Sequence, residues 1–415
     1  MRRGTAWIGV LLVSATAAAL AEDWPRFRGP EGTGISRERE VPLKWAAAEN
    51  VRWKAPLPGP GMSSPIVWGG RVFLTQALDR EGTQRALLCF DRHTGRLLWQ
   101  RAVEHREKES TYDGEPHFCS ATPATDGQRV VAFFASAGLL CTDMNGRVLW
   151  RKDLGRCEQI WGTASSPILH KDLVILNFGP GPRTFLIALD KRTGQERWRV
   201  AKPGTFGEKP SEWMGSWATP VAARIRGREE LIMMWPDAVE SHDPATGRTL
   251  WTCRGLGRLS YTSPLVTPEV VVAFSGFGGP ALAVRTGGSG DVTETHRLWR
   301  EEKSTQRIGS GVIVDGHAYI VNENGTAQCI DWKSGRTLWT ERATGRTWSS
   351  IVHAAGRLYV TDQQGETTVL AAKPVLEVLA RNPLGERTQA SIAVSDGELF
   401  IRTYAHLWCI GGPKR

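Results

Sequence analysis

Short runs of aliphatic and β-branched residues recur along the whole chain, and Gly, Asp and Asn separate them. Examples are RVFLTQ (71–76), ALLCFD (86–91) and HAYIVN (317–322). Runs of this kind between turn residues predict strands joined as hairpins rather than helices. The hydrophobic pattern therefore predicts an all-β protein.

A nine-residue segment that ends in tryptophan repeats along the chain. It reads DRHTGRLLW (91–99), DKRTGQERW (190–198), DPATGRTLW (243–251) and DWKSGRTLW (331–339), with a looser copy at 143–150 and a stretched copy at 284–299. The Asp and Gly suit a tight turn, because Asp accepts hydrogen bonds from nearby amides and Gly tolerates a positive φ. A repeat with a period of about 40 to 50 residues indicates units that stack to bury their apolar faces.

Each unit reads as four antiparallel strands, which is the blade of a β-propeller. The eight inner strands are expected to begin at Pro65, Pro123, Pro167, Pro220, Pro264, Val312, Ile351 and Ile392. The last unit ends before its tryptophan strand, whereas the segment ENVRWKAPL (49–57) precedes the first unit. We therefore predict one eight-bladed propeller over residues 51–412, in which Trp53 completes the blade containing Ser391 to Ile410.

The tryptophans of the repeat are interpreted as docking residues, because a large ring fills the wedge between neighbouring blades. These residues are Trp53, Trp99, Trp150, Trp198, Trp251, Trp299 and Trp339.

The first 21 residues have the composition of a secretory leader, with Arg2 and Arg3 before an apolar stretch and small residues near its end. We predict a signal peptide at 1–21, cleaved before Glu22, and an N-terminal extension at 22–50. A membrane anchor is the alternative for the leader. The mature protein is expected to be periplasmic or secreted.

The seven cysteines do not read as a disulfide framework. Four of them share one slot in the third strand of their blades, where Ala188 stands in the third blade, which indicates a small buried position. These four are Cys89, Cys141, Cys329 and Cys409. Equivalent positions in different blades are too far apart to bridge. A bridge between Cys119 and Cys157, in connections between blades, stays open.

The formal charge of +9 and the pI near 9.3 suit an anionic partner. The Lys and Arg residues are scattered rather than clustered, so nucleic acid is not an expected partner. An anionic polysaccharide or a lipid surface fits better.

The repeat ALDKRTGQERW (188–198), with its closing tryptophan, resembles the docking repeat of the PQQ-like, quinoprotein-type β-propellers. The segment DWPRFRGPEGTGIS (23–36) is similar to the opening of PQQ-repeat proteins of planctomycete-type bacteria. The resemblance implies either a PQQ-dependent dehydrogenase of alcohols or sugars, or a BamB-like periplasmic scaffold without catalysis. Repeats of this kind specify the fold and not the function.

The dehydrogenase branch implies an adjacent Cys-Cys pair over the quinone, a Glu/Asn/Asp set for Ca²⁺ and a catalytic Asp. The chain has no two adjacent cysteines and no CxxCH haem motif. The resemblance therefore favours the non-catalytic branch, with no cofactor, no metal and no catalytic residue; PQQ with Ca²⁺ is the alternative.

A candidate site is expected where the connections between blades open onto one rim of the central channel. Positions three before the inner strands should ring this channel: Met62, Ser120, Ala164, Trp217, Tyr261, Gly309, Trp348 and Gln389. Exposed aromatic and Arg residues converging on a funnel are typical of binding sites. The candidate partner-binding residues are His117, Trp161, Trp213, Trp217, Tyr261, Arg307, Trp348 and Arg387. The alternative is that these side chains plug the channel.

The polar connection 101–118 carries several residues that could ligate a metal, but their spacing matches no ligand motif, and no metal site is predicted. They are His105, Glu107, Glu109, Asp113, Glu115 and His117.

The sequence thus favours an exported, monomeric scaffold with a protein partner in the cell envelope, with outer-membrane protein assembly as its expected setting. A quinone-dependent dehydrogenase is the first alternative. A carbohydrate-binding module, suggested by the rim aromatics, is the second.

Overall fold

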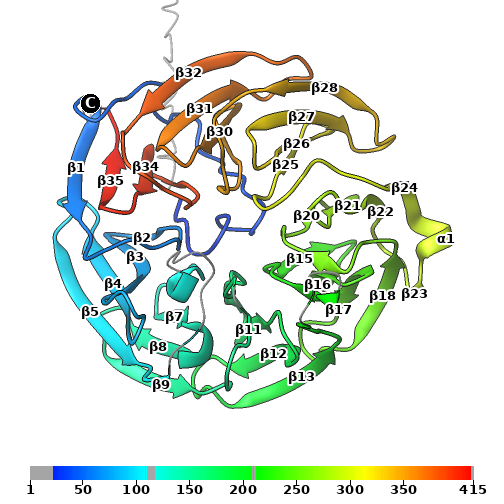
Figure 1. Cartoon of the computed structure of the whole chain (residues 1–415), viewed down its shortest axis with the longest axis horizontal. Helices are drawn as coiled ribbons and strands as arrows, with labels where there is room; N and C mark the ends of the chain where they lie inside the picture. The colour runs from blue at the N-terminus through cyan, green and yellow to red at the C-terminus, as the bar shows by residue number, and fades with distance from the viewer. Residues whose placement is uncertain are drawn as a thin grey trace, which may run out of the picture.

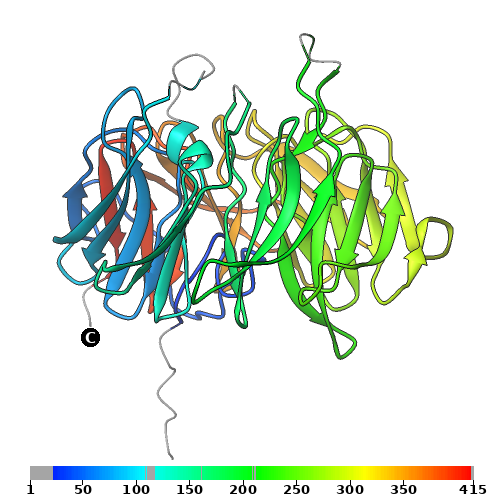
Figure 2. The ribbon, with the colours of Figure 1, turned by 90° about the horizontal axis from the view of Figure 1, so that it is seen from below.

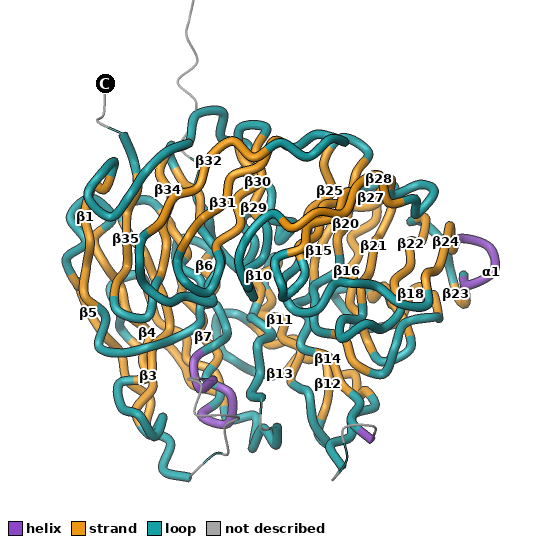
Figure 3. Tube along the Cα trace, turned by 45° about the horizontal axis from the view of Figure 1, so that its top comes forward, coloured by secondary structure: helices purple, strands orange, loops and turns teal. Residues whose placement is uncertain are grey.

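The computed structural model describes residues 22–107, 109, 117–159, 161–207, 209 and 212–412. The predicted signal peptide, residues 1–21, lies outside these residues. Eight antiparallel sheets stand around a central axis (Figure 1). Strands make up almost all of the regular structure (Figure 3). The predicted all-β, eight-bladed propeller is therefore confirmed.

Blades 1 to 4 follow one another along the chain, each from its inner to its outer strand. Blade 1 contains β2 (Ile66–Trp68), β3 (Arg71–Ala77), β4 (Gln84–Asp91) and β5 (Leu97–Glu104). Blade 2 contains β6 (Ala124–Thr125), β7 (Arg129–Phe133), β8 (Leu139–Asp143) and β9 (Val148–Lys152). Blade 3 contains β10 (Ile168–His170), β11 (Leu173–Phe178), β12 (Thr184–Asp190) and β13 (Glu196–Lys202). Blade 4 contains β15 (Val221–Ile225), β16 (Arg228–Trp235), β17 (Ala238–His242) and β18 (Thr249–Arg254).

Blades 5 to 8 complete the ring. Blade 5 contains β20 (Leu265–Val266), β21 (Val270–Phe274), β22 (Ala281–Arg285) and β24 (Arg297–Glu301). Blade 6 contains β25 (Val312–Val314), β26 (His317–Val321), β27 (Thr326–Asp331) and β28 (Thr337–Arg342). Blade 7 contains β29 (Val352–Ala354), β30 (Arg357–Thr361), β31 (Glu366–Ala371) and β32 (Val378–Pro383). Blade 8 contains β33 (Ala393–Ser395), β34 (Glu398–Arg402), β35 (His406–Ile410) and β1 (Val51–Pro56).

Short elements lie between these strands. Strand β14 (Gly215–Ser216) pairs in parallel with β19 (Leu259–Ser260), and β23 (Gly290–Asp291) pairs in parallel with β18. The helical pieces are η1 (His117–Cys119), η2 (Ala135–Ala137) and α1 (Thr293–His296). Within the described part of the chain, no helix has the length and apolar character that a membrane span requires.

The two ends of the chain close the ring in blade 8. Strand β1 pairs antiparallel with β35, and Trp53 lies opposite Cys409 in the register. The predicted placement of Trp53 is therefore confirmed. Because β1 covers the edge of β35, that edge is not available for pairing with another chain.

Five repeat tryptophans lie against the glycine turn of the following blade. A Cβ added at Gly95 would meet the Trp53 indole at 2.6 Å, and Gly146 has the same relation to Trp99. The other three pairs are Gly194 with Trp150, Gly247 with Trp198 and Gly335 with Trp299. Each of these indoles also donates a hydrogen bond to a backbone carbonyl in that turn, as Trp53 does to Arg92 at 2.7 Å. The turn needs Gly because it combines a positive φ with this close approach.

Trp251 and Trp339 differ because the next blade lacks the standard turn. The stretched repeat of blade 5 brings β23 beside β18, and the Trp251 indole donates to the buried Glu230 carboxylate at 2.8 Å. Blade 7 has no Thr-Gly turn, and Trp339 Nε1 is buried without a hydrogen-bond partner among the described residues.

The shared cysteine slot lies directly opposite the docking tryptophan. Cys89 pairs with Trp99 and Cys141 with Trp150, while Ala188 pairs with Trp198 in blade 3. All seven cysteines are free, including Cys119 and Cys157, so the open question of a bridge between these two is answered in the negative. Burial raises the pKa of both thiols to about 12.

The N-terminal extension crosses the ring on one side of the molecule instead of lying outside it (Figures 1 and 2). Trp24 exchanges backbone hydrogen bonds with Val67 of blade 1, and His353 of blade 7 donates to Gly34. The buried Arg28 guanidinium donates to the Gly311 carbonyl of blade 6 at 2.6 Å. These contacts join distant blades through a single segment, residues 24–36.

The rest of the extension fills the junction between blades 7 and 8. Blade 7 carries Ala380 where the other outer strands carry tryptophan. Trp45, which is buried, stacks on Tyr359 with ring centroids 6.4 Å apart, and its amide donates to Asn382. Because the outer strand of blade 8 is not joined to β35 by a turn, no glycine turn exists there for a blade 7 tryptophan. Trp45 supplies the aromatic ring at this junction.

Candidate functional site

One serine or threonine from each blade forms a closed ring of hydrogen bonds around the central axis. Each residue donates its backbone amide to the hydroxyl oxygen of the corresponding residue in the next blade, at 2.9–3.1 Å. In order, the residues are Ser64, Thr122, Ser166, Thr219, Ser263, Ser310, Ser350 and Ser391, which donates back to Ser64. We call this set the hydroxyl ring.

The hydroxyl ring lies in the wall of a central cavity of about 590 Å³. Every blade contributes residues to the wall, through the connections that precede the inner strands. Phe27 of the crossing segment also lines it. The cavity is therefore a funnel: it opens among the connections, and residues 24–36 cross the ring on the other side (Figure 2).

The predicted rim positions lie around the funnel with one shift in register. Met62, Ser120, Ala164, Trp217, Tyr261, Trp348 and Gln389 all line the cavity. Gly309 does not, and Ile308 stands in its place. The hydroxyl ring shows why: Ser310 is equivalent to Ser64, so Gly311 rather than Val312 corresponds to Pro65. The prediction at Gly309 is wrong by one residue.

One wall of the funnel is aromatic and comes from the connections before blades 3 to 5. Trp217 stacks on Tyr261 with ring centroids 4.5 Å apart, and Trp161 lies within 6.3 Å of both rings. Phe277, from the loop between β21 and β22, stacks on Trp161 at 5.9 Å. Phe277 is 46% exposed and has a φ of +54°, a conformation that L side chains rarely adopt.

Trp217 lines the funnel, but most of its side chain is packed against neighbouring residues. Its indole is 6% exposed and donates to the Gly162 carbonyl at 3.0 Å. Burial by this cluster raises the pKa of Tyr261. The packing of Trp217 fits the expected plug, whereas the exposed Phe277 keeps part of this wall open to the cavity.

The opposite wall is cationic and comes from blades 6 to 8. Arg307 forms an ion pair with Glu323 at 2.9 Å and lies 3.9 Å from the centroid of the Phe277 ring. Arg346 forms a second ion pair with Glu323, and the Trp348 indole donates to the same carboxylate at 3.3 Å. Burial opposes ionisation of Glu323, but the hydrogen bonds from Arg346 and Trp348 and the charge of Arg307 outweigh it and lower its pKa. Glu323 is therefore ionised at neutral pH.

Six of the eight candidate residues line the funnel: Trp161, Trp217, Tyr261, Arg307, Trp348 and Arg387. Trp213 lies behind them, edge-on to Trp161 at 4.6 Å and stacked on Phe206. His117 begins η1, and its side chain lies outside what the structure describes.

Several lining residues escaped the sequence analysis. Phe277, Glu323 and Gln363 sit in loops inside blades, Arg346 lies two residues before Trp348 in the connection to blade 7, and Phe27 belongs to the extension. The hydroxyl ring had a visible signal, the recurring Ser or Thr before the inner strand in SSP, ATP and TSP.

The possible metal set of connection 101–118 is not assembled in the described residues. Glu109 forms an ion pair with the buried Arg85, and His105 lies 4.0 Å from Glu109. Asp113 and Glu115 lie outside the described residues. Elsewhere in the described ranges, no group of three His, Cys, Asp or Glu could hold a metal ion.

The funnel does not fit the Ca²⁺ that accompanies PQQ in the dehydrogenase branch. Glu323 is the one carboxylate among the described lining residues, and two arginines already neutralise it. Calcium needs six to eight oxygen ligands, several of them usually carboxylates.

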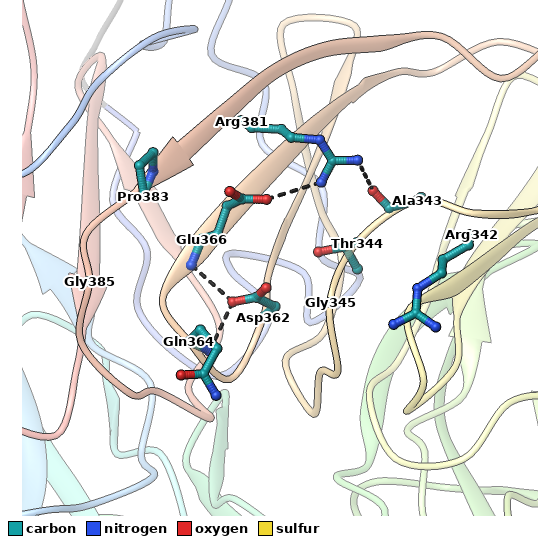
Figure 4. Close-up of a pocket in the computed structure, with 10 residues that line it drawn as sticks. All are labelled: Arg342, Ala343, Thr344, Gly345, Asp362, Gln364, Glu366, Arg381, Pro383 and Gly385. Atoms are coloured by element: carbon teal, nitrogen blue, oxygen red, sulfur yellow. Dashed lines mark hydrogen bonds and ion pairs between the residues drawn. The ribbon is translucent and has the colours of Figure 1, made fainter.

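A second hollow of about 600 Å³ lies between blades 6 and 7 (Figure 4). Arg381 crosses it, donating to Glu366 at 3.0 Å and to the Ala343 carbonyl at 2.9 Å, and Asp362 accepts from backbone amides of its own turn. Because these groups satisfy one another, the hollow reads as a packed junction rather than a site.

The sequence repeats, the eight packed blades and the closure of the ring are features of one protein family. A family model described as "Outer membrane protein assembly factor BamB" matches residues 36–159, 82–232 and 236–405, which together span most of the chain. The chain belongs to the BamB family.

Solved structures similar to this BamB-family chain come from both branches of the fold. Quinohemoprotein alcohol dehydrogenase from Comamonas testosteroni has a TM-score of 0.69 at 13% identity, over 95% of this chain and 81% of that chain. A europium-containing methanol dehydrogenase has a TM-score of 0.69 at 11% identity, over 93% and 90%. BamB from Moraxella catarrhalis has a TM-score of 0.58 at 15% identity, over 88% and 94%. Identities this low show the fold alone.

A search of curated proteins returned no match to this BamB-family sequence. Function must therefore be argued from the funnel itself.

Proposed function

We propose that this protein is an exported, non-catalytic binding scaffold whose funnel face engages a protein partner in the cell envelope. One observation carries the proposal: all eight blades converge on a funnel with an aromatic wall on one side and an arginine wall on the other. Aromatic and Arg residues are the side chains that dominate binding energy at protein interfaces. The family description names outer membrane protein assembly, and we place the proposed role in that setting.

The loops around the funnel support this choice. The described segments 203–207 and 212–214 rise from the funnel face as the two sides of a hairpin (Figure 2), in which Thr205 and Met214 exchange backbone hydrogen bonds. The hairpin presents Phe206 and Trp213, stacked at 4.8 Å, at its base. Interaction specificity is commonly built on loops held by a rigid ring.

Trp348 is the residue to test, and Trp217 is not. Trp217 is buried and hydrogen-bonded, so its alanine variant should lose about 3–5 kcal/mol of folding stability. Trp348 is half-buried, and among the described residues its indole donates one hydrogen bond, to Glu323. Trp348→Ala should therefore leave the melting temperature within a few degrees of wild type.

The experiment is capture from an envelope extract with the immobilised mature chain, followed by mass spectrometry. A partner that is retained by wild type and by the exposed-arginine control Arg342→Gln, and is lost with Trp348→Ala, supports the proposal. Equal capture by all three proteins would contradict it. Stoichiometric binding of PQQ with Ca²⁺, accompanied by dye-linked turnover of an alcohol or sugar, would replace it with the dehydrogenase alternative.

A further inference from the structure

The exposed apolar residues of this protein gather on one side of the ring. The described residues include six large hydrophobic side chains that are exposed, and five of them lie at the start of an outer strand or in the turn before it. These five are Leu97, Val148, Leu298, Val375 and Val378, with exposed fractions from 39% to 70%. The sixth, Phe277, lines the funnel. The five residues therefore belong to a second surface, separate from the funnel.

This second surface lies on the side of the ring opposite the funnel opening. The outer strands all run toward the connections that open on the funnel, so their starts lie on the other side. In blade 1, the turn before the outer strand touches the turn between the first two strands, because the Arg92 amide donates to the Gly70 carbonyl at 2.9 Å. The N-terminal extension lies here too: Asp23 accepts the Gly69 amide at 2.7 Å, and residues 24–36 cross the ring on this side (Figure 2). We call this side the turn face.

Exposed arginines accompany the apolar residues on the turn face. The residue after the turn glycine is an exposed arginine in four blades: Arg96, Arg147, Arg248 and Arg336. Arg147 pairs with Asp143 at 3.3 Å, and the other three form no ion pair among the described residues. The turn aspartates point into their turns, as Asp91 does when it accepts the amides of His93 and Thr94. The tips of these turns are therefore basic.

Blade 4 adds a basic hairpin that projects from the turn face. Its inner strand β15 has five residues, whereas the inner strands of the other seven blades have two or three. Like β2, β15 begins directly after a proline, so its additional residues lie on the turn side. Arg224, Arg226 and Arg228 are exposed in this hairpin. Arg228 pairs with Glu230, and the other two arginines form no ion pair in the described part of the chain.

A lipid bilayer fits this arrangement better than a folded protein does. A protein interface of standard size needs about 800 Å² of surface on each partner. The five apolar residues are instead spread along the rim, over blades 1, 2, 5 and 7. A bilayer meets a whole rim at once, because aliphatic side chains enter the boundary between headgroups and acyl chains while basic side chains contact lipid phosphates.

We propose that the turn face docks on an anionic lipid membrane. The five apolar residues of the rim enter the headgroup region, and the arginines of the turn tips and of the blade 4 hairpin hold the lipid phosphates. The formal charge of +9 favours this attraction. The predicted leader joins the chain on this face, so the face is nearest the membrane while the leader is held there. The funnel then points away from the bilayer, toward a protein partner. The inference goes beyond the proposed function and does not depend on it.

The test is flotation of the mature protein with vesicles made of equal parts of phosphatidylethanolamine and phosphatidylglycerol. Vesicles of phosphatidylcholine are the neutral control. The protein should float with the anionic vesicles and float less as salt rises, because salt screens exposed charges. Its apparent Kd for phosphatidylcholine vesicles should be higher by about tenfold or more.

Two double variants address the two components of the turn face. Leu97→Ser/Val375→Ser removes apolar side chains from the rim, and Arg224→Gln/Arg226→Gln removes charges from the hairpin. Each should raise the apparent Kd for the anionic vesicles by about tenfold. All four residues are exposed, so both variants should keep the melting temperature within a few degrees of wild type.

The matched controls lie on the funnel side. Phe277→Gly removes the remaining exposed hydrophobic residue, and Gly suits the φ of +54° at this position. Arg342→Gln removes an exposed arginine at the funnel end of β28. Both variants should bind the anionic vesicles as wild type does.

Several results would overturn the inference. Absence of flotation with the anionic vesicles is one, and equal binding of phosphatidylcholine vesicles is another. A loss of binding in Phe277→Gly or Arg342→Gln that matches the double variants would place the membrane contact on the funnel side. Light scattering that shows a dimer in wild type and a monomer in Leu97→Ser/Val375→Ser would assign the apolar rim to a second copy of this chain.

Discussion

One hydroxyl per blade joins all eight blades at the centre of this molecule. Thr219 illustrates its role: its Oγ1 accepts the Ser166 amide at 3.0 Å, and its own amide donates to Ser263 at 3.1 Å. These groups are buried beside a cavity, where a backbone amide without an acceptor is costly. The hydroxyl ring therefore satisfies eight amides that no β-ladder reaches.

Thr219→Val tests this role. The variant keeps the shape of the side chain but removes the acceptor of the Ser166 amide, so it should cost about 1–3 kcal/mol of unfolding free energy. Urea unfolding of the mature protein measures the change. Thr142→Val is the matched control, because Thr142 Oγ1 is buried without a partner among the described residues, and its loss should be neutral or stabilising. Equal destabilisation by the two variants would show that the ring hydrogen bonds add nothing.

At the scale of the element, a blade is held to the next by an indole resting on a glycine turn. The arrangement depends on the absence of a Cβ, because the Trp53 indole occupies the space beside Gly95. Where the turn is missing, other groups take its place. Strand β23 lies beside the strand that carries Trp251, and Trp45 packs against Tyr359 of blade 7.

The junction between blades 8 and 1 is also held by two buried arginines. Arg402, fully buried, donates to Ser63 and to the Thr75 carbonyl at 2.8 Å. Arg92 pairs with Glu398 at 3.1 Å. These contacts reinforce the one blade whose strands are not continuous in the chain.

Gly95→Ala tests the docking contact. The substitution should destabilise the protein by about 1–2 kcal/mol through its positive φ alone, with a further loss because its Cβ would clash with Trp53. Gly356→Ala isolates the first effect, since Gly356 has a similar φ, +71° against +73°, and open space around it. Thermal and urea unfolding compare the two. The docking interpretation predicts that Gly95→Ala is clearly the more destabilising; the same loss in both would contradict it.

At the scale of the whole molecule, the N-terminal residues have two separable roles. Strand β1 completes blade 8 and covers the edge of β35, whereas residues 24–36 cross the ring and line the cavity through Phe27. An uncovered strand edge invites pairing with another chain, and a missing segment across the channel does not.

Two truncations separate these roles. Deletion of residues 22–56 removes β1 and should produce self-association, which light scattering after size exclusion detects. Deletion of 22–36 alone retains β1 and Trp45 and should leave the oligomeric state of the mature chain unchanged. A monomeric 22–56 deletion would mean that β1 is dispensable for closing the ring.

Much of this architecture could be predicted from the sequence, because repeats report on contacts that recur. The Asp-Thr-Gly turn, the small residue opposite Trp99 and the pairing of Trp53 with the last blade all follow from comparing one unit with another. The error at Gly309 arose in the same way: GSGV lacks the proline that marks the register elsewhere, and the hydroxyl at Ser310 was the better marker.

The site was predicted less completely, because it is made where the repeats differ. Phe277 and Glu323 lie in loops inside blades rather than in the connections where the site was sought, and Phe27 reaches the cavity from an extension more than thirty residues before the first blade. Only the closed ring brings these residues to one axis. The sequence by itself determined the blade, the number of blades and the closing strand, since each depends on local turns and a repeated apolar pattern. The tertiary structure alone decided that one wall of the funnel is aromatic, the other cationic and the ring crossed by the chain's own N-terminal segment, because those neighbours come from distant parts of the chain.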